Sequence, residues 1–137
     1  MQKTNRKTTV TVKKRSPEAS EQSELISWAN EVAELGVYPE LQWLHSIPNG
    51  GRRDKAEAAH LKKQGVKPGV PDLCLPVPRG CFHGLYIEMK VGKNKPTENQ
   101  KRWINGLKFN GYAVAVCYSA AAARQTIIEY LQLRGKA

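Results

Sequence analysis

The sequence contains little cysteine, and its cysteines follow no familiar spacing. The three residues, Cys74, Cys81 and Cys117, are odd in number and form no C-x-x-C motif. This argues against the disulfide framework that stabilises many small secreted proteins, and also against a structural zinc site. We therefore expect free thiols in a reducing compartment.

Long apolar segments are missing as well. The N-terminal region lacks the apolar stretch of a secretory signal, and no segment approaches the roughly 18 consecutive apolar residues of a membrane helix. There is no internal repeat, and the length of 137 residues is typical of a single domain. These features predict a soluble, cytoplasmic protein with one folded domain and no membrane partner.

Acidic residues are scarce relative to basic ones. The chain has 22 lysines and arginines against 12 aspartates and glutamates, which gives a formal net charge of +10. A balance of this sign favours binding to a phosphate backbone. Part of the excess comes from residues 1–16, a basic, threonine-rich leader that we expect to be disordered. That leader would either contact nucleic acid or serve only as a solubilising tail.

Helix and strand patterns alternate through residues 17–137, which we assign to one domain. Helical apolar spacing and short apolar runs predict helices over 17–35, 54–64, 97–110 and 120–133, and strands over 41–47, 72–77, 85–91 and 112–118. The order α-β-α-β-β-α-β-α predicts an α/β fold in which helices flank a mixed β-sheet. The last strand is continuously apolar, so we expect it to be buried on both faces.

Three polar residues stand out on the two central strands. Asp72 begins the first of them, while Glu88 and Lys90 lie on the second and face the same way, because side chains alternate along a strand. If the strands form a hairpin, two carboxylates and an ammonium meet at one point. Such a group suits a divalent metal ion and a phosphate. The alternative is that Glu88 and Lys90 form an ordinary ion pair on a solvated face of the sheet.

These residues also resemble a known signature. Pro71-Asp72 followed by Glu88-Met89-Lys90 is similar to the motif of the PD-(D/E)XK nuclease superfamily. Further segments narrow the resemblance to its VRR-NUC family: Ile47-Pro48-Asn49-Gly50-Gly51-x-Arg53, Gly65 to Asp72, Gly84 to Lys90, and Gln100-x-x-Trp103. The likeness extends from Glu21 to Leu131 and implies a restriction-endonuclease-like core.

The resemblance implies roles for individual residues. Asp72 and Glu88 match the metal-binding acids of the family, and the carbonyl of Met89 would complete the coordination. Lys90 matches the catalytic lysine, and Gln100 matches a glutamine that lies beside the site. The complete set favours an active enzyme over a degraded one.

The family also has an acidic residue on its first helix, which would be a further metal ligand. Glu21 is the best match in this sequence, and Glu24 lies one turn further on. Either residue could instead be an ordinary first-turn acid that is favoured by the helix dipole.

A glycine-rich segment before the second helix is a candidate contact for DNA. Its exposed backbone amides and two guanidinium groups suit a phosphate, although a plain hairpin turn is the alternative. The segment comprises Asn49, Gly50, Gly51, Arg52 and Arg53.

Together, the motifs predict an endonuclease that hydrolyses DNA phosphodiesters with Mg²⁺ or Mn²⁺. Stand-alone family members of this size resemble phage and prophage proteins that act as homodimers on branched DNA, such as four-way (Holliday) junctions. The resemblance therefore implies a homodimer that acts on branched DNA inside a bacterial cell. Two alternatives stay open: a non-catalytic DNA-binding module with the same fold, and a nuclease for single-stranded nucleic acid, because phosphate contacts alone do not identify the substrate.

Overall fold

The computed structural model of the chain describes residues 17–48 and 54–135. The elements, in order, are α1 (Pro17–Glu34), the 3₁₀ helix η1 (Pro39–Trp43), β1 (His45–Ser46), α2 (Lys55–Lys63), β2 (Leu73–Leu75), β3 (Leu85–Met89), α3 (Glu98–Phe109), β4 (Ala113–Cys117) and α4 (Ala120–Leu131). The predicted leader and the candidate DNA segment 49–53 lie outside the described residues. No helix in the described part is long and apolar enough to cross a membrane.

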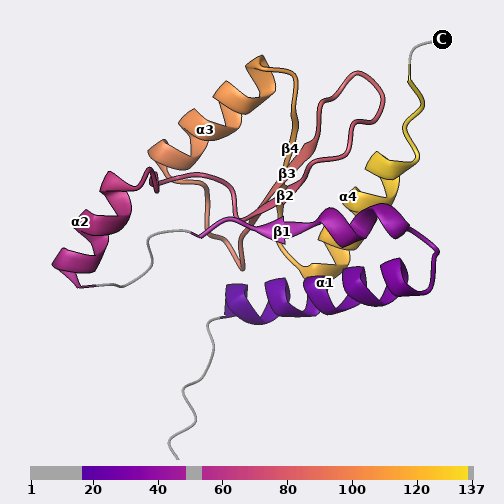
Figure 1. The fold of residues 1–137 in the computed structure, drawn as a ribbon, viewed down its shortest axis with the longest axis horizontal. Coiled ribbons are helices and arrows are strands. Elements are labelled where there is room, and N and C mark those ends of the chain that lie inside the picture. Colours follow the sequence, from indigo (N-terminus) through magenta and orange to yellow (C-terminus); the bar gives the residue numbers. More distant parts are fainter. Residues whose placement is uncertain (1–16, 49–53, 136–137) are drawn as a thin grey trace, which may run out of the picture.

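The four strands form one mixed sheet in the order β1-β2-β3-β4 (Figure 1). β1 with β2 and β2 with β3 are antiparallel pairs, whereas β3 and β4 are parallel. A parallel pair needs a long crossover, and α3 supplies it. The α/β fold with a mixed sheet and flanking helices is therefore confirmed.

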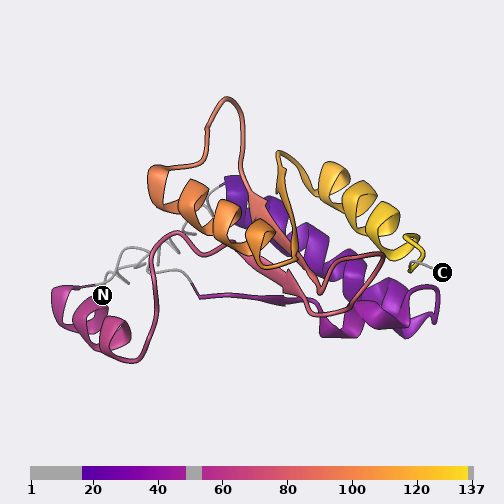
Figure 2. The same ribbon diagram turned by 90° about the horizontal axis from the view of Figure 1, so that it is seen from above.

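The sheet has different partners on its two faces. On one face Leu85, Ile87 and Met89 join the hydrophobic core, to which α1 contributes Leu25 and α4 contributes Ile127. The opposite face of β3 carries Tyr86 and Glu88, and α3 lies over this face (Figure 2). The alternation predicted for β3 is thus observed, and it directs its polar residues away from the core.

The strand predicted over residues 41–47 is mostly wrong. Residues Pro39–Trp43 form the 3₁₀ helix η1, and only His45–Ser46 is strand. Proline at the start of η1 has its backbone φ angle already set for a helical turn. Leu41 and Leu44 are both buried at a spacing of three residues, which fits a helical turn better than strand alternation.

The expectation that the last strand is buried on both faces is also wrong. β4 lies at the edge of the sheet, and four of its five residues, Ala113 to Val116, are only half-buried. A continuous apolar run suggested a central strand, but it does not reveal the order of strands in a sheet.

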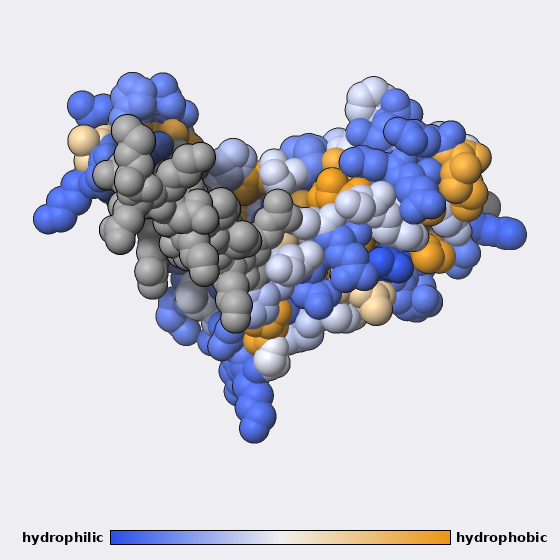
Figure 3. Space-filling model, turned by 90° about the horizontal axis from the view of Figure 1, so that it is seen from below, coloured by the Kyte–Doolittle hydropathy of each residue, from blue (hydrophilic) through white to orange (hydrophobic). Residues whose placement is uncertain are grey.

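Figure 3 shows the face of the molecule that is seen from below. Viewed from below, the described surface is mainly hydrophilic, and its larger hydrophobic areas lie in the middle and at the end opposite α2 (Figure 3). α2 stands apart from the sheet and buries none of its side chains.

Candidate active site

The pairing of β2 with β3 brings the two predicted acids together. Leu73 lies opposite Ile87, so continuing the antiparallel register by one residue places Asp72 opposite Glu88. The backbone N–H of Met89 donates a 2.8 Å hydrogen bond to Asp72 Oδ2. Asp72 is therefore fixed to the neighbouring strand by its own carboxylate.

The backbone just before Asp72 passes very close to helix α3. Gly69 has a φ of +89°, and a Cβ atom at this position would lie 2.6 Å from the carbonyl carbon of Asn99 in α3. Only glycine combines this backbone conformation with such a close approach. Further along, the carbonyl of Asp72 accepts a 2.7 Å hydrogen bond from the N–H of Ile47. Backbone contacts on both sides thus hold the segment before β2 against α3 and the sheet.

Glu88 is the most buried charged residue of the site, with 2% of its surface exposed. Its Oε1 accepts a 3.0 Å hydrogen bond from Gln100 Nε2 and lies 3.9 Å from Lys90 Nζ. Its Oε2 is buried and has no hydrogen-bond partner among the described residues. A buried oxygen without a partner is unfavourable unless a ligand satisfies it.

Gln100 links the site to the start of α3. Its side-chain Oε1 accepts a 2.9 Å hydrogen bond from the N–H of Thr97, and the Thr97 hydroxyl accepts one from the N–H of Gln100. This reciprocal arrangement is the predicted capping box. Because the amide nitrogen of Gln100 remains available, the same side chain caps the helix and orients Glu88.

The environment favours the neutral form of Glu88. Burial, followed by the negative charge of Asp72, raises the pKa of Glu88 from 4.5 to about 8, although Lys90 opposes the rise. The carboxyl group is therefore mostly protonated at neutral pH when no cation is bound. A divalent cation beside it would favour the ionised form.

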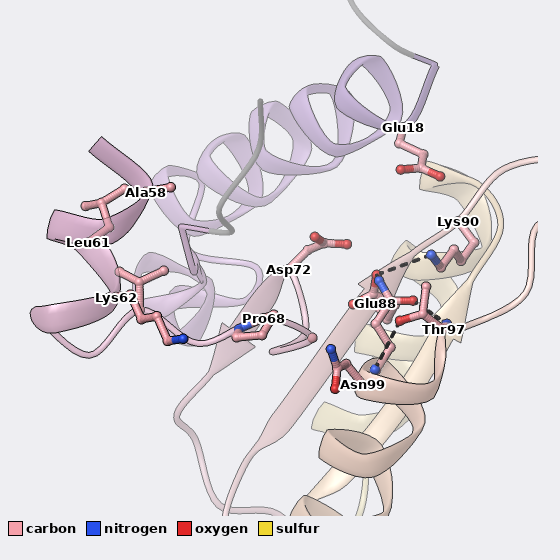
Figure 4. A pocket seen from close by; sticks show the side chains of 13 residues that line it. Glu18, Ala58, Leu61, Lys62, Pro68, Asp72, Glu88, Lys90, Thr97 and Asn99 are labelled. Atoms are coloured by element: carbon pink, nitrogen blue, oxygen red, sulfur yellow. Dashed lines mark hydrogen bonds and ion pairs between the residues drawn. The ribbon is translucent and has the colours of Figure 1, made fainter. Parts of the chain in front are cut away.

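Both acids open into the same cavity, whose volume is about 550 Å³ (Figure 4). Helix α2 forms its far wall, while α3 and the loop before β2 form the near side. The polar residues that line it are Glu18, Lys62, Asp72, Glu88, Lys90, Thr97, Asn99 and Gln100. The structure thus brings together Asp72, Glu88, Lys90 and Gln100.

Glu21 does not line this cavity. Its Oε2 accepts a 2.6 Å hydrogen bond from the N–H of Ala120 and so caps α4. Glu24, the alternative, forms an ion pair with Arg124 over 3.0 Å. Both carboxylates therefore have partners elsewhere in the fold.

Glu18, rather than Glu21, is the acid of α1 that lines the cavity. It lies one turn earlier on α1 and lines the cavity, with its carboxylate directed towards the side where Asp72 and Lys90 lie (Figure 4). Its negative charge also contributes to the raised pKa of Glu88. The sequence held one indication that Glu18 could reach the site. Glu18 and Glu21 are three residues apart, so they lie on neighbouring parts of one helix face.

The donor set fits a hard divalent cation. Asp72 and Glu88 present carboxylate oxygens to one cavity, and Glu88 Oε2 has no other partner among the described residues. Within the described ranges, no three His, Cys, Asp or Glu side chains are close enough to form a complete protein cage. Mg²⁺ is typically held by one or two carboxylates, with water and substrate phosphate as its other ligands. Two acids in an open cavity match that preference.

Comparisons with known proteins agree with this geometry. The family model for the VRR-NUC domain matches residues 4–121. A solved structure described as a VRR_NUC domain protein superposes with a TM-score of 0.71 and 28% sequence identity, covering 90% of this chain and 96% of that one. A search of curated proteins gave no match. The chain therefore belongs to the VRR-NUC domain family, and its fold is of the nuclease type.

Proposed function

We propose that this protein is a metal-dependent DNA endonuclease that hydrolyses phosphodiester bonds with Mg²⁺ or Mn²⁺. The observation that carries the proposal is the convergence of Asp72, Glu88 and Lys90 in one open cavity. The buried Oε2 of Glu88 has no hydrogen-bond donor among the described residues, and this supports the proposal because a bound cation would satisfy it.

Each residue has a distinct role in the proposal. Asp72 and Glu88 hold the metal ion, the Met89 carbonyl is a further candidate ligand, and Glu18 adds negative charge to the cavity. A bound divalent ion would polarise the scissile phosphate and lower the pKa of a coordinated water. Lys90 is only 8% exposed, so its ammonium charge is poorly screened and stabilises negative charge that develops on the phosphate.

The preferred substrate in this proposal is branched DNA, such as a four-way junction, and the active form is a homodimer. The resemblance to stand-alone family members supports both points, and the net charge of +10 supports a nucleic-acid substrate. Two sites related by a twofold axis suit paired cuts in a symmetric junction. A protein with this function would act in the cytoplasm of a bacterial cell, including a cell infected by a phage.

A cleavage panel tests the proposal. Linear duplex, flap, single-stranded and four-way-junction DNA are incubated with Mn²⁺, Mg²⁺ or EDTA, using wild type and Lys90→Ala. Lys108→Ala is the matched control, since it removes an exposed lysine of α3 that lies outside the cavity. We expect the wild type and the control to cut junction DNA fastest, and the Lys90 variant to lose cleavage.

Three other outcomes of the cleavage panel would contradict parts of the proposal. Binding without cleavage in any metal would indicate a DNA-binding module, and faster cutting of single strands than of junctions would change the substrate class. Equal rates for the Lys90 variant and wild type would remove Lys90 from the mechanism. Sedimentation of the protein with and without junction DNA tests the homodimer.

A further inference from the structure

A second cavity, of about 400 Å³, lies beside α3 and next to the candidate active site. We call it the α3 groove. Its lining residues are Lys67, Arg102, Trp103, Gly106, Leu107 and Asn110. None of them contributes to the cavity that holds Asp72 and Glu88.

The apolar residues of the α3 groove are not explained by the fold. Ile104 is the only fully buried residue of α3, and neither Trp103 nor Leu107 belongs to the described hydrophobic core or packs against it. The indole N–H of Trp103 is buried and has no acceptor among the described residues, whereas the side chain as a whole is only half-buried. Trp103 lines the groove and keeps part of its ring exposed there, so that part of the ring is accessible to a ligand.

The charges of the groove are available to a ligand. Arg79, Lys101 and Arg124 each form an ion pair with a glutamate. In contrast, Lys67 and Arg102 form no ion pair with any described residue, and both are exposed. Two unpaired cations beside an aromatic ring suit a group that combines a phosphate with a flat apolar surface.

The groove continues directly from the active-site cavity. Asn99, Trp103, Gly106 and Asn110 follow one another at helical spacing, so they form one stripe along α3. Asn99 lines the active-site cavity, whereas the other three line the groove. Asn99 and Trp103 are separated by about 6 Å along the helix axis, which one extended nucleotide can span. A strand leaving the active site could therefore follow this stripe.

We propose that the α3 groove binds an unpaired nucleotide of the DNA substrate, with its base against Trp103 and its phosphate against Lys67 and Arg102. The site rests on the proposed nuclease function and sharpens its substrate class. A base must be unpaired and unstacked to lie against a side chain, so the groove favours branched DNA in which a nucleotide at the branch point, next to the cleaved site, is unpaired. Gly106 provides the opening, because a Cβ atom there would meet nothing within 4 Å.

The decisive variant is Gly106→Leu, which fills the groove without removing any contact. Anisotropy of labelled DNA in EDTA compares a duplex carrying a short single-stranded extension with a blunt duplex of equal length. Wild type is expected to prefer the extended duplex, and Gly106→Leu is expected to lose roughly tenfold in affinity for it while its affinity for the blunt duplex stays unchanged. Replacing a helical glycine by leucine favours the helix, so the variant should melt at the same or a higher temperature.

Two further variants and one control complete the test. Trp103→Leu and Arg102→Gln should each reduce the preference for the extended duplex, while Phe109→Leu should not. Phe109 is the matched control because it is an aromatic residue of α3 that is 91% exposed and lies outside the groove.

Equal affinities of wild type and Gly106→Leu for the extended duplex would overturn the proposal, as would equal losses on both duplexes. No cleavage enters this measurement. A protein that never cuts DNA can still pass it, so failure of the nuclease function and failure of the groove are distinguishable.

Discussion

The Gln100 side chain donates a hydrogen bond to Glu88 across 3.0 Å while its own oxygen caps α3. One amide therefore couples the start of a helix to the orientation of a buried carboxylate on the sheet. In the proposed metal site Gln100 would hydrogen-bond to a metal ligand, and partners of this kind commonly affect metal affinity and activity.

Replacing Gln100 by alanine should separate these two contributions. We expect cleavage of junction DNA to fall roughly 10–100-fold, because Glu88 loses its orienting donor. The free energy of unfolding should fall by about 1 kcal/mol, because one capping bond is lost. Ser119→Ala is the control, since it removes the side-chain cap of α4 away from the cavity. If both variants lose activity equally, the effect of Gln100 is only structural.

Glu18 and Glu21 should respond differently to the same substitution. Glu18→Gln is expected to weaken Mn²⁺ binding, because it removes a negative charge from the cavity. Glu21→Gln should leave Mn²⁺ binding intact but lower stability by about 1 kcal/mol, because the N–H of Ala120 exchanges a charged acceptor for a neutral one. Calorimetric titration with Mn²⁺ and urea unfolding measure the two effects. If Glu21→Gln weakened Mn²⁺ binding and Glu18→Gln did not, Glu21 would be the acid of α1 that acts at the metal site.

The stability of the metal-free protein should depend on pH through Glu88. The pKa of this group is about 8 in the folded state against 4.5 ordinarily. Between these values the folded state binds more protons than the unfolded state, so stability falls as pH rises, by at most about 1.4 kcal/mol per unit. The contribution is fully present below pH 4.5 and is lost as pH rises through about 8.

Urea unfolding in EDTA at intervals between about pH 5 and 7.5 measures this slope. Glu88→Gln is the control, because its amide does not titrate, and its slope should be less steep than that of wild type. Mn²⁺ should bind more tightly to wild type as pH rises over the same range, since the cation competes with the proton. Identical slopes for wild type and variant would contradict the raised pKa.

Gly69→Ala should affect both folding and the site. A positive φ at a residue other than glycine is unfavourable by about 1–3 kcal/mol, and the methyl group would also collide with Asn99. The segment before Asp72 must then move, so Mn²⁺ affinity should fall as well. Gly36→Ala is the matched control for the backbone effect alone. Gly36 also has a positive φ, of +75°, but an added Cβ there would meet nothing within 4 Å. Equal destabilisation of the two variants with unchanged Mn²⁺ affinity would exclude this mechanism.

The sequence predicted the site best where local rules determine the geometry. Alternation along β3 determines that Glu88 and Lys90 share a face, and the Thr97–Gln100 spacing determines the capping box. The position of Asp72 opposite Glu88 required only that the two strands form a hairpin.

Glu18 was missed because its position depends on tertiary packing. The rotation of α1 is set by the burial of Leu25 and Ala29, and nothing local distinguishes Glu18, Glu21 and Glu24 as the acid that reaches the cavity. The edge position of β4 was missed for a similar reason, since strand order is a property of the whole sheet.

Helix α2 forms the far wall of the cavity and buries none of its side chains. Most substitutions on its surface should therefore change stability little, whereas Asp72 and Glu88 are tied to the sheet and α3. The α2 side of the cavity should therefore tolerate substitution more easily than the side that carries the two carboxylates. Changes in the charge, length or shape of α2 should therefore alter the far wall of the cavity while the carboxylate pair stays in place.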